Sequence, residues 1–197
     1  MTSHGIAGYD AFDDPYCYPG TTVLRNLLDI RDQSELDAFE VEISTLRADE
    51  PLPVGNFDPA HYRRIHHHLF QDVYDWAGEY RTVRTSKGGN LFCYPENIPA
   101  QMAALFARLR GGEAFADLSR EAFLDQFTSF LAELNAVHPF REGNGRSQLS
   151  FVGLIGEVSG HPLHLEKLNK ETFLPAIIAS YFGNLQPLQD ELNTLLV

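Results

Sequence analysis

The chain has 197 residues, 44% of them hydrophobic, which is enough apolar surface for a sizeable core. Its 27 acidic against 15 basic side chains give a formal charge of −12 without a Lys/Arg cluster, which argues against nucleic acid as the main partner. The chain has two cysteines and no secretion signal, and none of its apolar runs reaches the roughly 20 residues that span a membrane. We therefore expect one cytoplasmic domain without membrane contact.

Irregular and helical patterns alternate in the first half of the chain. Residues 9–22 are irregular and aromatic, which predicts a strap that lies over the body of the protein. We expect three parts: the strap at residues 1–30, the core and flap at 31–160, and the C-terminal helices at 161–197. Apolar residues at steps of three and four predict an amphipathic helix over 33–48, with the stripe Leu36, Phe39, Ile43 and Leu46. A second helix is predicted from the Asp58-Pro59 start as far as Val73.

One β element and several helices are expected after residue 78. Two short β-type runs surround a Gly-rich turn, which predicts a hairpin over residues 80–94. Helical periodicity returns in five later segments, at residues 95–109, 119–138, 146–158, 170–182 and 185–196. The predicted fold class is therefore mainly α, a bundle of about six to eight helices with one hairpin.

Three consecutive histidines, at residues 66–68, raise the question of a metal site. Neighbouring side chains on a helix point about 100° apart, so these three cannot chelate one ion together. We therefore interpret them as structural or exposed residues.

The segment His138-Pro139-Phe140-Arg141-Glu142-Gly143-Asn144-Gly145-Arg146 joins two predicted helices and carries unusual chemistry. Its glycines allow backbone N–H groups to face an anion at the start of the second helix, where the dipole favours negative charge. Arg141 and Arg146 can add contacts to phosphate. Glu142 offers the hard oxygen that Mg²⁺ prefers on a polyphosphate, and the imidazole of His138 suits a general base near neutrality. The segment is predicted to handle phosphate with its own base.

These nine residues resemble, at every fixed position, the Fic family signature H-P-F-x-[D/E]-G-N-G-R. Residues 15–25, 65–84 and 86–89 are also similar to bacterial Fic proteins, so the resemblance covers nearly the whole chain. It is closest to the Fic toxins of bacterial toxin–antitoxin modules. The resemblance implies a single Fic domain over 1–197 that acts as a protein adenylyltransferase, using Mg²⁺ and ATP to move AMP onto a Tyr, Ser or Thr hydroxyl of a target protein.

The resemblance also implies roles for individual residues. His138 would take the proton of the target hydroxyl as that oxygen attacks the α-phosphate, and Glu142 would hold Mg²⁺. Backbone amides around Gly143 and Gly145, with the side chain of Asn144, would bind the α-phosphate oxygens as charge shifts in the transition state.

One family contact is missing from this sequence. Arg146 would neutralise the outgoing phosphates, but Leu149 stands where many Fic enzymes place a second arginine for the γ-phosphate. Arg141 or Lys87 are candidates to compensate, and Gln148 is a further polar candidate. Two alternatives therefore stay open: a Fic-fold phosphotransferase or other nucleotidyl transferase, and a binding module weakened in catalysis by Leu149.

Two protein partners follow from the resemblance. The hairpin over 80–94 would be a flap that pairs with an extended target segment, and type II topoisomerase ATPase subunits are the suggested target. Fic proteins are commonly restrained by a helix carrying Ser or Thr, Glu four residues later, then Gly or Asn. Ser129 and Glu133 have this spacing, but Leu134 follows them, so no such helix is found in the chain. A separate small antitoxin is expected to carry it.

Overall fold

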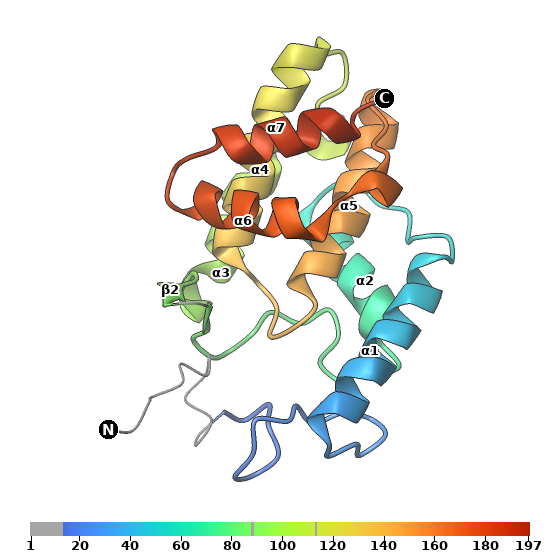
Figure 1. Ribbon diagram of the computed structural model, residues 1–197, viewed down its shortest axis with the longest axis vertical. Helices are drawn as coiled ribbons and strands as arrows, with labels where there is room; N and C mark the ends of the chain where they lie inside the picture. The colour runs from blue at the N-terminus through green and yellow to red at the C-terminus, as the bar shows by residue number, and fades with distance from the viewer. Residues whose placement is uncertain (1–13, 88, 113) are drawn as a thin grey trace.

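The structure is a computed structural model that describes residues 14–87, 89–112 and 114–197 (Figure 1). The first 13 residues of the predicted strap lie outside this description. The helices are α1 (Gln33–Ala48), α2 (Pro59–Phe70), α3 (Ile98–Phe106), α4 (Arg120–Val137), α5 (Asn144–Ser159), α6 (Lys170–Tyr181) and α7 (Gln186–Leu195). Strands β1 (Ser86–Lys87) and β2 (Asn90–Leu91) form the hairpin, and 3-10 turns cover Pro95–Asn97, Ala107–Gly112 and Leu165–Lys167. The predicted fold class is confirmed. Within the described residues, none of the helices has the length and apolar character to cross a membrane.

Side-chain caps fix where several helices begin. Asp32, Asp58 and Ser119 each accept a hydrogen bond from the N–H three residues later, at 3.0, 2.6 and 3.3 Å. α2 ends at Phe70, before the predicted end at Val73, because the chain turns there. The predicted helix positions otherwise hold to within a few residues.

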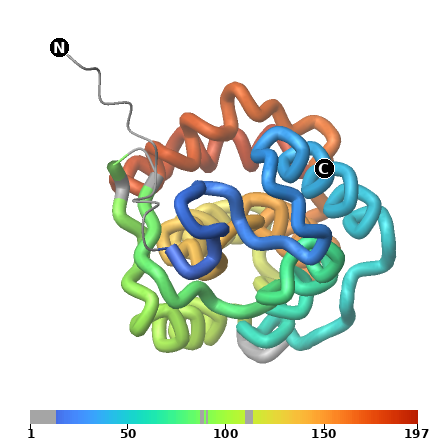
Figure 2. Tube along the Cα trace, turned by 90° about the horizontal axis from the view of Figure 1, so that it is seen from below, coloured from blue at the N-terminus to red at the C-terminus, as the bar shows by residue number. Residues whose placement is uncertain are grey.

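The central helices of the bundle are α4 and α5. α4 contacts α3, α5, α6 and α7, while α2 contacts α1, α3 and α5. α6 and α7 pack on each other and lie across α4 (Figure 1). Residues 14–32 cross the end of the bundle at which α4 leads into α5 (Figure 2). The core between α2, α3, α4 and α5 is largely aromatic, with Tyr62, Phe106, Phe130, Phe140 and Phe151 in contact.

The buried face of α1 differs from the predicted apolar stripe. Leu36 is buried as expected, but Leu46 at the other end of that stripe is 57% exposed. Glu40 and Ser44 join Leu36 on the buried face instead. The reason is Arg146 of α5, which takes its hydrogen-bond acceptors from this face. Hydrophobic periodicity alone could not show that.

The hairpin is much shorter than the predicted range 80–94. Its strands have two residues each, with Ser86 opposite Leu91. Beyond β2 the backbone turns to α4, where the N–H of Cys93 donates to the carbonyl of Ala136 at 3.3 Å. The N–H of Phe92 still donates across the hairpin to the carbonyl of Thr85 at 3.1 Å, but from Cys93 onward the backbone bonds to the end of α4, which limits the length of the hairpin.

Arg81, in the segment that precedes β1, closes the end of α4. Its side chain is buried, and its backbone N–H donates to the carbonyl of Pro139 at 2.9 Å. The guanidinium donates to the carbonyls of Val137, His138 and Cys93 at 3.2, 2.8 and 2.5 Å. The last carbonyls of a helix lack partners within the helix, and the dipole favours a cation there. Arg81 therefore satisfies the end of α4 and fastens the hairpin to it.

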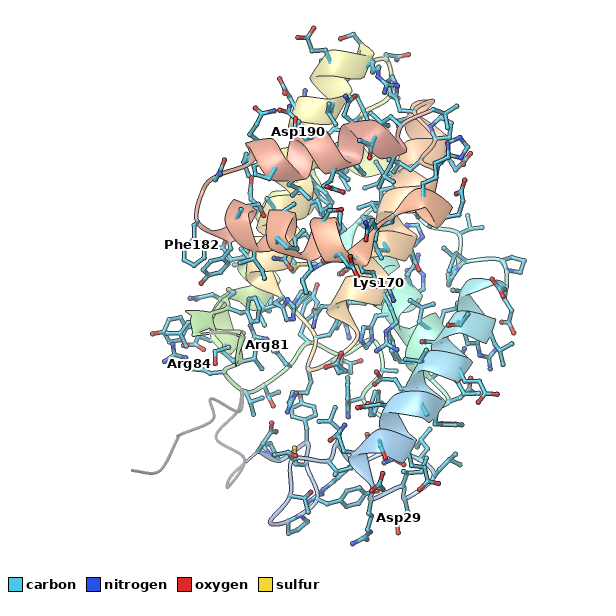
Figure 3. All side chains as sticks on the ribbon, viewed as in Figure 1. Asp29, Arg81, Arg84, Lys170, Phe182 and Asp190 are labelled. Atoms are coloured by element: carbon cyan, nitrogen blue, oxygen red, sulfur yellow. The ribbon has the colours of Figure 1, made fainter. Side chains whose placement is uncertain are left out.

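Replacing Arg81 by Met should lower the free energy of unfolding by roughly 3 kcal/mol or more, because several buried carbonyls lose their donor. Arg84→Met is the matched control, since this exposed arginine lies at the outer side of the same segment, against Tyr94 (Figure 3). Denaturant titration of both variants measures the difference. Equal losses would contradict the role assigned to Arg81.

Candidate active site

His138 lies at the point where α4 ends. It adopts a left-handed conformation with φ 49°, and its N–H donates to the carbonyl of Leu134 at 3.1 Å. The imidazole stacks on Phe92, with ring centroids 3.8 Å apart and planes 5° from parallel. Because Phe92 directly follows β2, the imidazole is held against the base of the hairpin.

Two glycines at the start of α5 are needed for different reasons. Gly143 has φ 79°, and a Cβ there would lie 2.4 Å from the ring of Phe70, so both backbone conformation and space require glycine. Gly145 is exposed, and a Cβ there would meet nothing within 4 Å. The packing of the protein does not require glycine at 145, and the absence of a side chain leaves this backbone open to a group from outside.

The first turn of α5 presents open N–H groups. The N–H of Gly143 is bonded to Oε1 of Glu142 at 2.9 Å, and Ser147 is the first residue to bond back to Gly143. Among the described residues, no acceptor bonds the N–H groups of residues 144–146. A helix start with unsatisfied donors at the positive end of the dipole is a binding site for anions.

Asn144 does not face this opening. Its Oδ1 accepts from the N–H of Phe140 at 3.0 Å, and its Nδ2 donates to the carbonyl of Phe140 at 2.9 Å. Both ends of the amide are therefore used to close the loop. In this arrangement Asn144 holds the shape of the loop, and its predicted contact to the α-phosphate stays a prediction.

Arg141 is also turned away from the helix start. Its guanidinium contacts Asp14 through Nη2 at 2.8 Å and Nε at 2.9 Å, and both side chains are buried. This ion pair fixes the segment 14–32 to the loop, and the predicted contact of Arg141 to the nucleotide stays a prediction. The side chain of Lys87, the other predicted phosphate contact, lies outside the described part of the chain.

His66 supports the loop from α2, which the sequence did not predict. Its Nδ1 accepts from the N–H of Gly78 at 2.8 Å, so the neutral ring carries its proton on Nε2 and donates to the carbonyl of Glu142 at 3.0 Å. Burial lowers the pKa of His66 to about 3 and keeps the ring neutral. His67 and His68 bond other carbonyls, as expected of structural histidines.

Arg146 is held against α1 by residues that the sequence analysis missed. Its Nη2 pairs with Oε1 of Glu40, its Nη1 donates to Ser44 at 2.9 Å, and its guanidinium lies 4.7 Å from the ring centroid of Phe70. The hydroxyl of Tyr74 donates to the second carboxylate oxygen of Glu40. Burial raises the pKa of Glu40, and the charge of Arg146 opposes this shift. The only feature of the sequence that pointed to these partners was the spacing of Glu40 and Ser44, two polar residues four positions apart on α1.

Glu142 is the only carboxylate in the signature, and part of its side chain is exposed to solvent. Its side chain is 44% exposed, and Oε1 lies 3.8 Å from Nη2 of Arg146. Within the described residues there is no group of three His, Cys, Asp or Glu side chains that could hold a metal. A single hard-oxygen ligand beside an anion site fits Mg²⁺ that shares its other positions with phosphates and water.

Comparison with known sequences bears directly on this site. A sequence profile described as the Fic/DOC family matches residues 56–155. A probable protein adenylyltransferase of Sinorhizobium fredii is 50% identical over 189 residues, covering 95% of this chain and 98% of the relative. The probable protein adenylyltransferase Fic of Escherichia coli is 34% identical over 178 residues, covering 89% and 88% of the two chains.

Solved structures with the same arrangement are also Fic domains. BepC of Bartonella tribocorum, crystallised with AMPPNP, has a TM-score of 0.83 and 28% identity over 92% of this chain and 96% of its own. A Fic domain of Bartonella quintana with bound ADP has a TM-score of 0.84 and 27% identity over 92% and 94%. The predicted enzyme class, protein adenylyltransferase, is confirmed by the curated relatives. Sequence, fold and the α4–α5 junction together show that the chain belongs to the Fic/DOC family.

Proposed function

We propose that this protein transfers AMP from ATP to a Tyr, Ser or Thr hydroxyl of a target protein. One observation carries the proposal: the chain places an imidazole and an open helix start, with free space at Gly145, at a single junction between α4 and α5. Relatives named protein adenylyltransferases and Fic domains crystallised with AMPPNP or ADP support it.

In this proposal the start of α5 binds the phosphates. The N–H groups of residues 144–146 face the α-phosphate oxygens, and Gly145 leaves room for them. Arg146 adds a charge-assisted contact to the outgoing phosphates. Glu142 would hold Mg²⁺, which, when bound, neutralises charge on the phosphate oxygens.

His138 acts as the general base. A ring nitrogen takes the proton of the target hydroxyl while the hydroxyl oxygen forms a bond to the α-phosphorus. The bond from that phosphorus to the bridging oxygen breaks, and pyrophosphate leaves with the electron pair. The stack on Phe92 fixes the ring plane, so the nitrogen that accepts the proton is held in place before the target arrives.

The target docks on the hairpin, and the protein is the toxin of a toxin–antitoxin module. Within the described residues β1 and β2 pair as strands only with each other, and the carbonyl of Leu91 in β2 accepts from the hydroxyl of Tyr181, so the outer edge of β1 is the one proposed for an extended peptide. A small antitoxin supplies the inhibitory helix, which was not found in this sequence. Type II topoisomerase ATPase subunits stay the proposed target, on the resemblance alone.

Leu149 is the observation that favours a second candidate. It stands on α5 one turn after Arg146, where an apolar side chain offers no contact to a terminal phosphate. A Fic-fold phosphotransferase, or a binding module weakened in catalysis, is therefore the alternative.

Incubation of bacterial lysate with ATP labelled at either the α- or the γ-phosphate separates these functions. We expect label on a target protein from the α position only, because the β- and γ-phosphates leave together. Mass spectrometry of the labelled band should show an added adenylyl group. Label from the γ position alone would establish phosphotransfer instead, and label from neither would favour the binding module.

The variant His138→Ala should lose at least about 100-fold in transfer rate, since a general base contributes roughly 10²–10⁴. Its affinity for ATP, measured by calorimetry, should stay close to that of the wild type, because no phosphate contact is removed. His164→Ala is the control, a histidine paired with Glu166 outside this junction. Retained transfer in His138→Ala would exclude this imidazole as the base.

The variant Gly145→Ala should separate stability from nucleotide binding. A methyl group there meets no protein atom, and alanine favours helix over glycine by up to about 1 kcal/mol, so the melting temperature should hold or rise. The dissociation constant for ATP should rise roughly tenfold or more, about 1.4 kcal/mol, because the methyl group occupies the approach to the N–H groups. Unchanged affinity for ATP would show that the phosphates do not bind at the start of α5.

A further inference from the structure

The partners of Arg146 on α1 are built into the fold. Glu40 is buried on the inner face of α1, 106 residues away from Arg146 in the sequence. Its carboxylate has two partners: one oxygen bonds Nη2 of Arg146 and the other accepts from the hydroxyl of Tyr74. Tyr74 is itself buried and stacks on Trp76 at 4.3 Å. The carboxylate is therefore fixed from both sides.

The guanidinium of Arg146 is fixed as well, but not used up. Nη1 bonds the hydroxyl of Ser44 at 2.9 Å and the backbone carbonyl of Glu40 at 3.4 Å, and Phe70 lies beneath the guanidinium. Within the described residues no acceptor bonds Nε, and the side chain keeps 33% of its surface exposed. The Nη1 and Nη2 groups bond to α1, while the Nε–H group is left to bond a ligand at the start of α5.

We propose that Glu40 is a positioning residue for the nucleotide's phosphates, acting through Arg146 to hold its guanidinium beside the first turn of α5. The inference rests on the proposed function, because it concerns the same phosphate site. A flexible arginine loses rotamer freedom when it orders on a phosphate, and this loss weakens binding. An arginine already held by Glu40, Ser44 and Phe70 avoids most of that loss.

A different role for Glu40 leads to the opposite expectation. If the carboxylate competed with the phosphates for Arg146, its removal would tighten ATP binding. The contacts favour positioning, because Glu40 is buried and held by Tyr74 and cannot leave Arg146 without losing its own partners.

Steady-state kinetics of AMP transfer tests the inference. Glu40→Gln should raise KM for ATP roughly five- to tenfold with kcat within about twofold, a coupling of ordinary size for contacting residues. In the background Arg146→Ala, adding Glu40→Gln should change KM no further, because Glu40 acts through that side chain. Glu42→Gln, an exposed acid on the same helix, is the matched control and should leave both constants unchanged.

The melting temperature of each variant is recorded alongside the kinetics. Should Glu40→Gln fail to fold, Ser44→Ala removes only one bond to Arg146 and should still raise KM for ATP about two- to threefold. An unchanged or lower KM in the folded variants overturns the inference, and so does an additional effect of Glu40→Gln in the Arg146→Ala background. Calorimetry of the wild type with Mg²⁺-ATP is independent of these outcomes: absence of binding there would refute the proposed function itself.

Discussion

The site depends on one constraint on backbone hydrogen bonding: the carbonyls that end α4 are buried and need donors, while the N–H groups that begin α5 must stay without acceptors. Arg81 meets the first requirement with its backbone and its guanidinium. His66 adds a donor to the carbonyl of Glu142 inside the loop. The second requirement is met because Asn144 is directed back to Phe140. A rigid loop with satisfied carbonyls and open donors is preorganised for an anion.

Three arginines near this loop have three different tasks, and burial and partners decide which. Arg81 is buried among carbonyls and stabilises a helix end. Arg141 is buried against a carboxylate and fixes an N-terminal segment. Arg146 is partly exposed, with its close hydrogen bonds to Glu40 and Ser44 on α1 and Glu142 at a longer distance of 3.8 Å, and it remains able to meet a ligand. The same side-chain chemistry therefore serves stability twice and the proposed phosphate contact once, although two of the three belong to the same signature.

Local patterns in the sequence were enough for the helices and for the place of the site, because both depend on neighbouring residues. The range predicted for α1 agrees with the structure, and the signature lies between two helices as expected. Contacts between distant parts of the chain were not predicted. The ion pair of Arg141 with Asp14 was missed because the two residues are 127 positions apart in the sequence. Glu40 was missed since an acid on a helix is usually solvated, and the hairpin was overextended because its flanks bond to α4.

The parallel stack of His138 on Phe92 has a mechanical consequence. Arg81 bonds carbonyls on both sides of that stack, at Cys93 and at His138, so the hairpin base and the imidazole share one frame. The orientation of the ring therefore depends on the position of the hairpin base. The position of the hairpin and the orientation of the proposed base are therefore linked, so a substitution that reshapes the hairpin base also changes the surroundings of the imidazole.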